Sequence, residues 1–126
     1  IAIGDDENGW EYYSQDGTAA GGGNHKPYDT AEDLIKDQRN RYDNTYRIDT
    51  TPEEDQRMRK TAEENLDNPF SVNPFDSNRY HCGDLVNDTL EVGGVSYGEE
   101  AWGNPPNEAF EEIRRANPPN SRRVIY

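Results

Sequence analysis

Residues 1–14 read IAIGDDENGWEYYS, two short apolar and aromatic runs that flank an acidic, glycine-containing segment. Tight turns favour Asp, Asn and Gly, whereas Ile and Tyr are enriched in strands. The stretch therefore predicts a β-hairpin whose turn lies within residues 5–9. Pairing of Gly4 with Trp10 would fix the register of both strands.

The next stretch, DGTAAGGGNHKP at residues 16–27, has three consecutive glycines and no hydrophobic period. Such a composition predicts a mobile surface loop.

After this loop, residues 30–42 have Thr30 as a possible N-cap and Leu34 and Ile35 at helical spacing, so a first helix is expected there. Residues 44–50, NTYRIDT, alternate in the manner of a strand.

The clearest capping signal follows at Thr51, with Pro52 at the first helical position and Glu54 as the reciprocal partner. It predicts a second helix with an apolar stripe at Met58, Ala62 and Leu66. Two Asn-Pro steps then hold residues 67–80 extended.

Two further helices and a last strand complete the predicted order. One helix begins near Cys82 and ends at Gly93 and Gly94, a second contains Phe110 and Ile113, and residues 122–126 read as a strand. The face predicted for the helix near Cys82 consists of Leu85, Val86, Thr89 and Leu90.

These elements predict an α+β fold with a small antiparallel sheet and about four helices. A length of 126 residues suits one domain, residues 1–126, with a small core rich in tyrosine. Because the chain opens at Ile1 inside an apolar run and without Met, we expect a C-terminal fragment of a longer protein.

The formal net charge of −13 disfavours a broad nucleic-acid interface, because a polyanionic surface repels phosphate. No apolar run approaches the roughly 18 residues of a membrane span. One cysteine excludes an internal disulfide, and two histidines give no zinc-binding spacing. We expect no metal and no cofactor.

Cys82 has two interpretations. At a helix N-terminus, unpaired amide N–H groups and the helix dipole favour a thiolate, the reactive form of a nucleophile. Alternatively, Cys82, Val86 and Leu90 are spaced by four, and the sulfur would complete a buried stripe.

A nucleophilic thiol needs a base, and the chain offers two histidines. His81 is adjacent to Cys82 in the sequence, so its side chain diverges from the thiol. His25 lies in the glycine-rich loop, which could fold over the site, or it is an ordinary solvated side chain.

The segment YHCGDLVNDTLEVGG resembles the nucleophile segment of permuted papain-like (NlpC-type) cysteine hydrolases. The segments IAIGDDENGWEYYSQDG, PYDTAEDLI, YRIDTTPEEDQRM and PNEAFEEIRRANP are similar, in this order, to the C-terminal toxin domains of bacterial Rhs-type polymorphic proteins. The resemblance implies a permuted papain-like fold with Cys82 as the nucleophile.

The chain departs from that family at two places. The family's cysteine commonly follows Asn, whereas His81 precedes Cys82 here. The family's histidine lies in a Gly-His segment before the part that matches IAIG. The resemblance therefore implies a catalytic histidine upstream of Ile1, or its replacement by His25.

The hairpin register suggests the group that would orient the base. Asp16 would lie opposite the chain just before Ile1, where the family's histidine is expected, and Ser14 is the alternative. A plain turn role for Asp16, beside Gly17, stays open.

The leading hypothesis is a secreted antibacterial effector that acts as a cysteine-dependent hydrolase or acyltransferase on an amide or ester. The resemblance implies delivery into a neighbouring cell within a larger protein and inhibition by an immunity protein. A protein, a peptidoglycan peptide or a lipid could be the substrate. The alternative is a non-catalytic acidic module that binds a basic protein partner. Calcium binding at residues 4–10 is disfavoured, because the carboxylates are adjacent and do not alternate.

Overall fold

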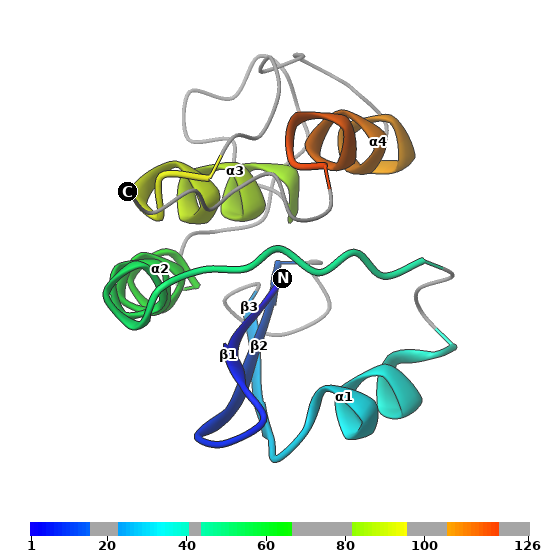
Figure 1. Cartoon of the computed structure of the whole chain (residues 1–126), viewed down its shortest axis with the longest axis vertical. Helices are drawn as coiled ribbons and strands as arrows, with labels where there is room; N and C mark the ends of the chain where they lie inside the picture. The colour runs from blue at the N-terminus through cyan, green and yellow to red at the C-terminus, as the bar shows by residue number, and fades with distance from the viewer. Residues whose placement is uncertain (16–22, 41–43, 67–81, 96–105, 119–126) are drawn as a thin grey trace.

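The computed structural model describes residues 1–15, 23–40, 44–66, 82–95 and 106–118. Within these ranges it contains a three-stranded antiparallel sheet and four helices, which confirms the predicted α+β class (Figure 1). The elements are β1 (Ala2–Asp5), β2 (Gly9–Gln15), β3 (Gly23–Tyr28), α1 (Ala31–Gln38), α2 (Pro52–Asn65), α3 (Cys82–Val92) and α4 (Pro106–Ala116).

The hairpin of β1 and β2 has the predicted register, with Gly4 opposite Trp10. The carboxylate of Asp5 closes the turn by accepting hydrogen bonds from the backbone amides of Glu7, at 2.9 Å, and Asn8, at 2.6 Å. Gly4 has a φ of 142°, and a Cβ there would lie 2.2 Å from the Gly9 carbonyl oxygen. The strands approach each other this closely only because position 4 has no side chain.

The loop predicted for residues 16–27 is wrong for its second half, because residues 23–28 form β3. This strand pairs with β2, with Tyr13 opposite His25. Its exposed residues His25, Lys26 and Pro27 gave no apolar alternation, but Lys and Pro are common on sheet edges, where they discourage further pairing.

The strand predicted for residues 44–50 is also wrong, because this segment forms no β-ladder. Its alternating side chains contact different elements instead of one sheet face. The Tyr46 hydroxyl donates to the Asn117 carbonyl, and Arg47 stacks over the Trp10 ring, 5.4 Å from its centroid. Ile48 packs against the core. The alternation in residues 44–50 therefore reflects contacts with several parts of the fold and not the two faces of a strand.

Helix α1 starts at its predicted N-cap, Thr30, which accepts from the amide of Asp33, but it ends at Gln38 rather than near residue 42. Helix α2 has the full predicted capping box between Thr51 and Glu54.

Helix α3 buries three of the four residues predicted for that face, Leu85, Thr89 and Leu90, and the fourth, Val86, is partly buried against the core. It ends in a Schellman motif: the Val95 amide donates to the Leu90 carbonyl at 2.9 Å and the Gly94 amide to the Glu91 carbonyl at 3.0 Å. Gly94 has the positive φ, 69°, that this motif requires. Helix α4 includes Phe110 and Ile113 as predicted, whereas the extended segment 67–80 and the last strand, 122–126, lie outside the described residues.

Side chains of directly paired residues lie on the same face of a sheet, so the register assigns each side chain to one of two faces. These two faces have different neighbours. One face, here called the core face, carries Ile3, Glu11, Tyr13 and His25, and packs on α2 and α3. The core consists of Ile3, Tyr13, Met58, Ala62, Leu85, Leu90 and Val95.

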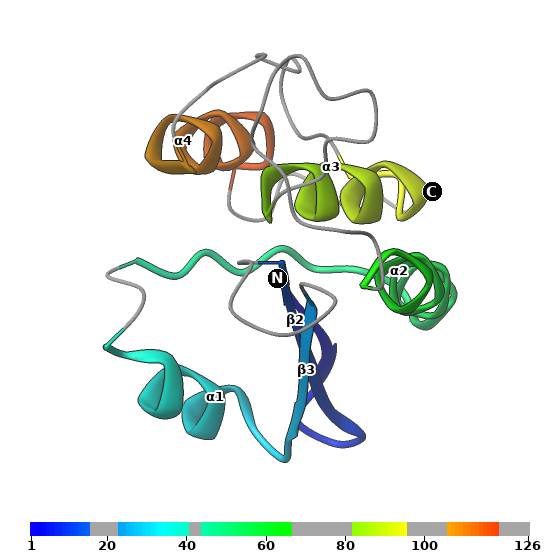
Figure 2. The ribbon, with the colours of Figure 1, turned by 180° about the vertical axis from the view of Figure 1, so that it is seen from behind.

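The opposite face, here called the α1 face, carries Trp10, Tyr12, Lys26 and Tyr28, the last two of which contact α1. Helix α1 lies at one end of the molecule, and α3 and α4 lie toward the other, as both views show (Figures 1 and 2).

Candidate functional site

Cys82 is the first residue of α3, and its side chain is an exposed free thiol. The rest of the helix is anchored by the buried side chains of Leu85 and Leu90. The buried-stripe interpretation of Cys82 is therefore wrong, because the thiol lies at the exposed start of the helix and outside the core cluster.

Ile1, the residue before β1, lies within electrostatic reach of this thiol. The amino group of Ile1 donates to the Tyr13 carbonyl at 3.0 Å, and the Tyr13 amide donates to the Ile1 carbonyl at 2.9 Å. Burial lowers the pKa of the Ile1 amino group to about 6, and an electrostatic interaction with Cys82 acts in the opposite direction. The fold thus joins the N-terminus of α3 to the Ile1 end of the sheet.

His25 lies on β3, opposite Tyr13, on the core face. Its ring stacks on the Tyr13 ring with a centroid separation of 4.6 Å and an interplanar angle of 12°. Its Nε2 atom contacts the Glu11 carboxylate in a very short polar contact. Glu11 is two residues nearer the hairpin turn than Tyr13, which pairs with Ile1. The contact with Glu11 therefore directs the imidazole Nε2 toward the turn and away from Ile1.

Within the described part of the chain, no contact joins His25 to Cys82; the recorded partners of His25 are Glu11 and Tyr13. Ile1 and His25 flank Tyr13 on opposite sides, and two strand spacings amount to roughly 10 Å. The catalytic role of His25 stays a prediction.

The other candidate positions are less informative. Asp16 and His81 lie outside the described residues. Ser14, the alternative orienting group, is buried, and its hydroxyl accepts from Asn24 Nδ2 at 3.5 Å. It is on the α1 face, the opposite face from Tyr13 and His25.

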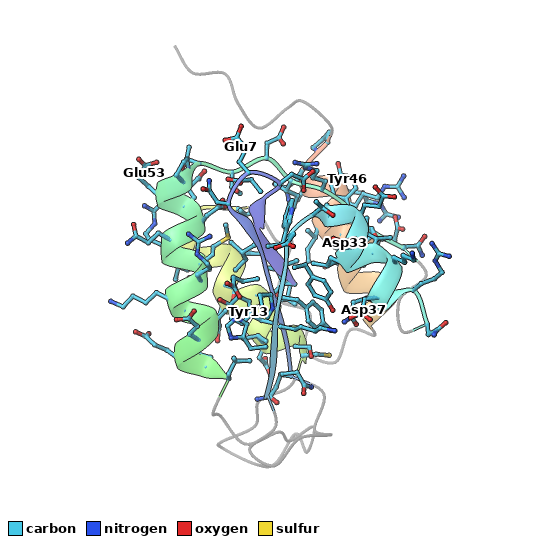
Figure 3. The ribbon with its side chains drawn as sticks, turned by 90° about the horizontal axis from the view of Figure 1, so that it is seen from below. Glu7, Tyr13, Asp33, Asp37, Tyr46 and Glu53 are labelled. Atoms are coloured by element: carbon cyan, nitrogen blue, oxygen red, sulfur yellow. The ribbon has the colours of Figure 1, made fainter. Side chains whose placement is uncertain are left out.

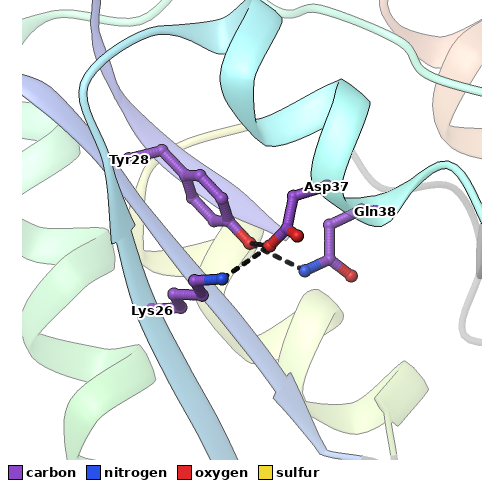
Figure 4. A network of polar contacts seen from close by, with 4 residues as sticks. All are labelled: Lys26, Tyr28, Asp37 and Gln38. Atoms are coloured by element: carbon purple, nitrogen blue, oxygen red, sulfur yellow. Dashed lines mark hydrogen bonds and ion pairs between the residues drawn. The ribbon is translucent and has the colours of Figure 1, made fainter.

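Two polar groupings were absent from the sequence prediction. One is the contact of Glu11 with His25, which follows from the strand register once β3 is recognised. The other connects β3 to α1: the Asp37 carboxylate contacts Lys26 Nζ at 2.7 Å and accepts from the Tyr28 hydroxyl (Figure 4). Sequence spacing could not reveal either, because both depend on a strand that lacks an apolar pattern.

Tyr13 connects the sheet to α2. Figure 3 shows Tyr13 between the sheet and α2. Its hydroxyl donates to Glu63 at 3.1 Å, and burial, followed by the negative charge of Glu63, raises the pKa of Tyr13. Such a tyrosine stays protonated at neutral pH and serves as a hydrogen-bond donor.

In the described ranges, no group of three or more His, Cys, Asp or Glu side chains could hold a metal ion. None of the helices in these ranges combines the length and apolar character needed to cross a membrane.

Comparison of the chain with models of protein families, with curated proteins and with solved structures gives no match. Function must therefore be argued from the residues themselves.

Proposed function

We propose that this domain is a cysteine-dependent hydrolase or acyltransferase, with a permuted papain-like fold, that acts as an antibacterial effector. The observation that supports it is the exposed thiol of Cys82 at the first position of α3, within electrostatic reach of the partly buried Ile1, which precedes β1. A helix start offers free amide N–H groups to an anion.

In the proposed reaction, the Cys82 thiolate attacks the carbonyl carbon of an amide or ester. Amides of the first turn of α3 stabilise the oxyanion, and the amine or alcohol leaves with a proton supplied by the base. Water or an amine then attacks the acyl-enzyme and releases the thiol. The base is a histidine upstream of Ile1 or His25, and Asp16 is the proposed orienting group.

The test is toxicity in a bacterial host that lacks the immunity protein. The 126-residue chain and a longer form of the parent protein are expressed, each with Cys82→Ala. Val92→Ala, a change at an exposed position of the same helix, is the matched control. We expect toxicity of the longer form to disappear with Cys82→Ala and to survive Val92→Ala.

Loss of toxicity with His25→Ala in the 126-residue chain would assign the base to His25. Toxicity that survives Cys82→Ala in both lengths would exclude thiol chemistry.

One observation favours the second candidate, an acidic module for a basic protein. Asp6 accepts from the Ala31 amide at 2.9 Å and so ties the hairpin turn to the start of α1. Glu7, Glu32 and Asp33, which are all exposed, lie within two residues of one or the other partner of this contact.

Binding to a lysine-rich peptide, measured by calorimetry at two salt concentrations, tests this second candidate. Joint replacement of these three carboxylates by amides should weaken binding, whereas Glu64→Gln on α2 should not. The candidate fails if both variants bind equally.

A further inference from the structure

Helix α1 is attached to the sheet in a different way from α2. It has no buried residue, and Ile35 is 43% exposed. Helix α2, in contrast, buries Met58 and Ala62 in the core. Since apolar burial provides most of the stability of a packed helix, α1 depends on polar contacts for its place on the sheet.

Asp6 supplies one such contact at the start of α1, where it accepts from the Ala31 amide at 2.9 Å. Four side chains at the seam between β3 and the end of α1 supply further contacts, and we call them the latch: Lys26, Tyr28, Asp37 and Gln38 (Figure 4). Asp37 contacts Lys26 Nζ at 2.7 Å and accepts from the Tyr28 hydroxyl, and Gln38 Nε2 donates to that hydroxyl at 2.9 Å. Lys26 also lies 5.2 Å from the centroid of the Tyr28 ring. Exposed ion pairs of this kind contribute little stability, and the latch is weak compared with the core.

The latch secures α1 against the aromatic side of the sheet. Tyr12 is directly opposite Lys26, and Trp10 is directly opposite Tyr28. Tyr12 is only 5% exposed, so this face carries a large buried ring close to the latch.

The described residues on either side of α1 are irregular. Residues 29–30 and 44–50 belong to no helix or strand, and residues 39–40 form a turn. As far as these described residues go, a movement of α1 breaks no β-ladder and no other helix.

We propose that α1 is a flap that detaches from the sheet as a unit while the core stays folded, and that the latch sets how often it opens. Opening uncovers the α1 face of the sheet, including Tyr12. This behaviour is independent of the chemistry proposed for Cys82.

Native-state hydrogen exchange of the 126-residue chain tests the flap. Amides of residues 34–38 should exchange through a local opening that low urea hardly changes, whereas the slowest amides of α2 should follow global unfolding. Lys26→Met should accelerate exchange in α1 about two- to fivefold, the range expected for loss of an exposed ion pair. Exchange in α2 should be unchanged.

Lys36→Met is the matched control, because it makes the same chemical change on α1 at an exposed residue outside the latch. It should leave exchange in α1 unchanged. Tyr28→Phe, which removes only a hydroxyl, should likewise accelerate hydrogen exchange in α1 and not in α2. It replaces Lys26→Met as the test if that variant does not fold. If amides of α1 and α2 exchange at equal rates and with equal urea dependence, α1 does not open separately and the flap is overturned. If Lys26→Met and Lys36→Met change exchange in α1 equally, the latch does not control the opening.

Discussion

At the scale of single residues, two adjacent carboxylates of the hairpin turn have different roles. Asp5 closes the turn on itself through the amides of Glu7 and Asn8. Asp6 joins two elements, because it accepts from the Trp10 indole at 2.7 Å and from the Ala31 amide. The turn is thus both a local structure and the dock for α1.

A pH-dependent contribution to stability follows from Asp6. The hydrogen bond from Trp10, and then that from the Ala31 amide, lowers the pKa of Asp6 below 3.8. A carboxyl group with a lowered folded-state pKa stabilises the fold above its unfolded pKa, and this contribution is lost as the pH falls through the folded value. Asp6→Asn should therefore lower the melting temperature at pH 6, and the difference should shrink below pH about 3.8.

Melting curves followed by circular dichroism between pH 6 and pH 2.5 measure this difference. Glu7→Gln, at the neighbouring exposed position, is the control and should show a smaller change at pH 6. A difference between wild type and Asp6→Asn that stays constant down to pH 2.5 would contradict the assignment.

At the scale of elements, α2 is defined by its own sequence. The Thr51 side chain accepts from the Glu54 amide at 3.1 Å, and the Glu54 side chain accepts from the Thr51 amide at 2.8 Å. Loss of an N-cap hydroxyl typically costs about 1 kcal/mol. We expect Thr51→Ala to lower the free energy of unfolding by about this amount, because α2 is part of the core.

Urea unfolding gives the value, with Thr45→Ala, at an exposed position outside the helices, as the control. Equal midpoints for the two variants would show that the capping box contributes no stability.

At the scale of the whole molecule, one apolar cluster unites β1, β2, α2 and α3. Leu85, at 1% exposure, lies in this cluster, whereas Ile35 is 43% exposed on α1. Leu85→Ala should lower the free energy of unfolding by about 2–5 kcal/mol, the usual cost of a cavity at a buried leucine. Ile35→Ala should change it by less than about 0.5 kcal/mol, as is common for surface positions.

Both values come from the same urea unfolding experiments, with near-ultraviolet circular dichroism reporting the buried tyrosines. If the two variants were equally destabilised, α1 would belong to the core and the flap would be excluded as well.

Several features of the fold follow from short stretches of sequence. The register of the hairpin, the capping box of α2, the buried face of α3 and its end at Gly93 and Gly94 all agree with prediction. Each depends on side chains and backbone groups a few residues apart, where the preferences of Asp, Thr, Pro and Gly act directly.

Other features required the tertiary structure. Residues 23–28 form a strand because they pair with the edge of β2, whereas residues 44–50, despite their alternation, pair with no strand of the sheet. Pairing depends on the partner as much as on the strand, so composition alone misjudged both segments.

The same limit applies to the candidate site. The sequence identified Cys82 at the start of a helix. The proximity of that thiol to Ile1 comes from the packing of α3 on the sheet, and the contact of His25 with Glu11 comes from the pairing of β3 with β2. Helix starts are encoded locally, whereas the partners of a reactive side chain are chosen by elements that are distant in sequence and meet only in the folded core.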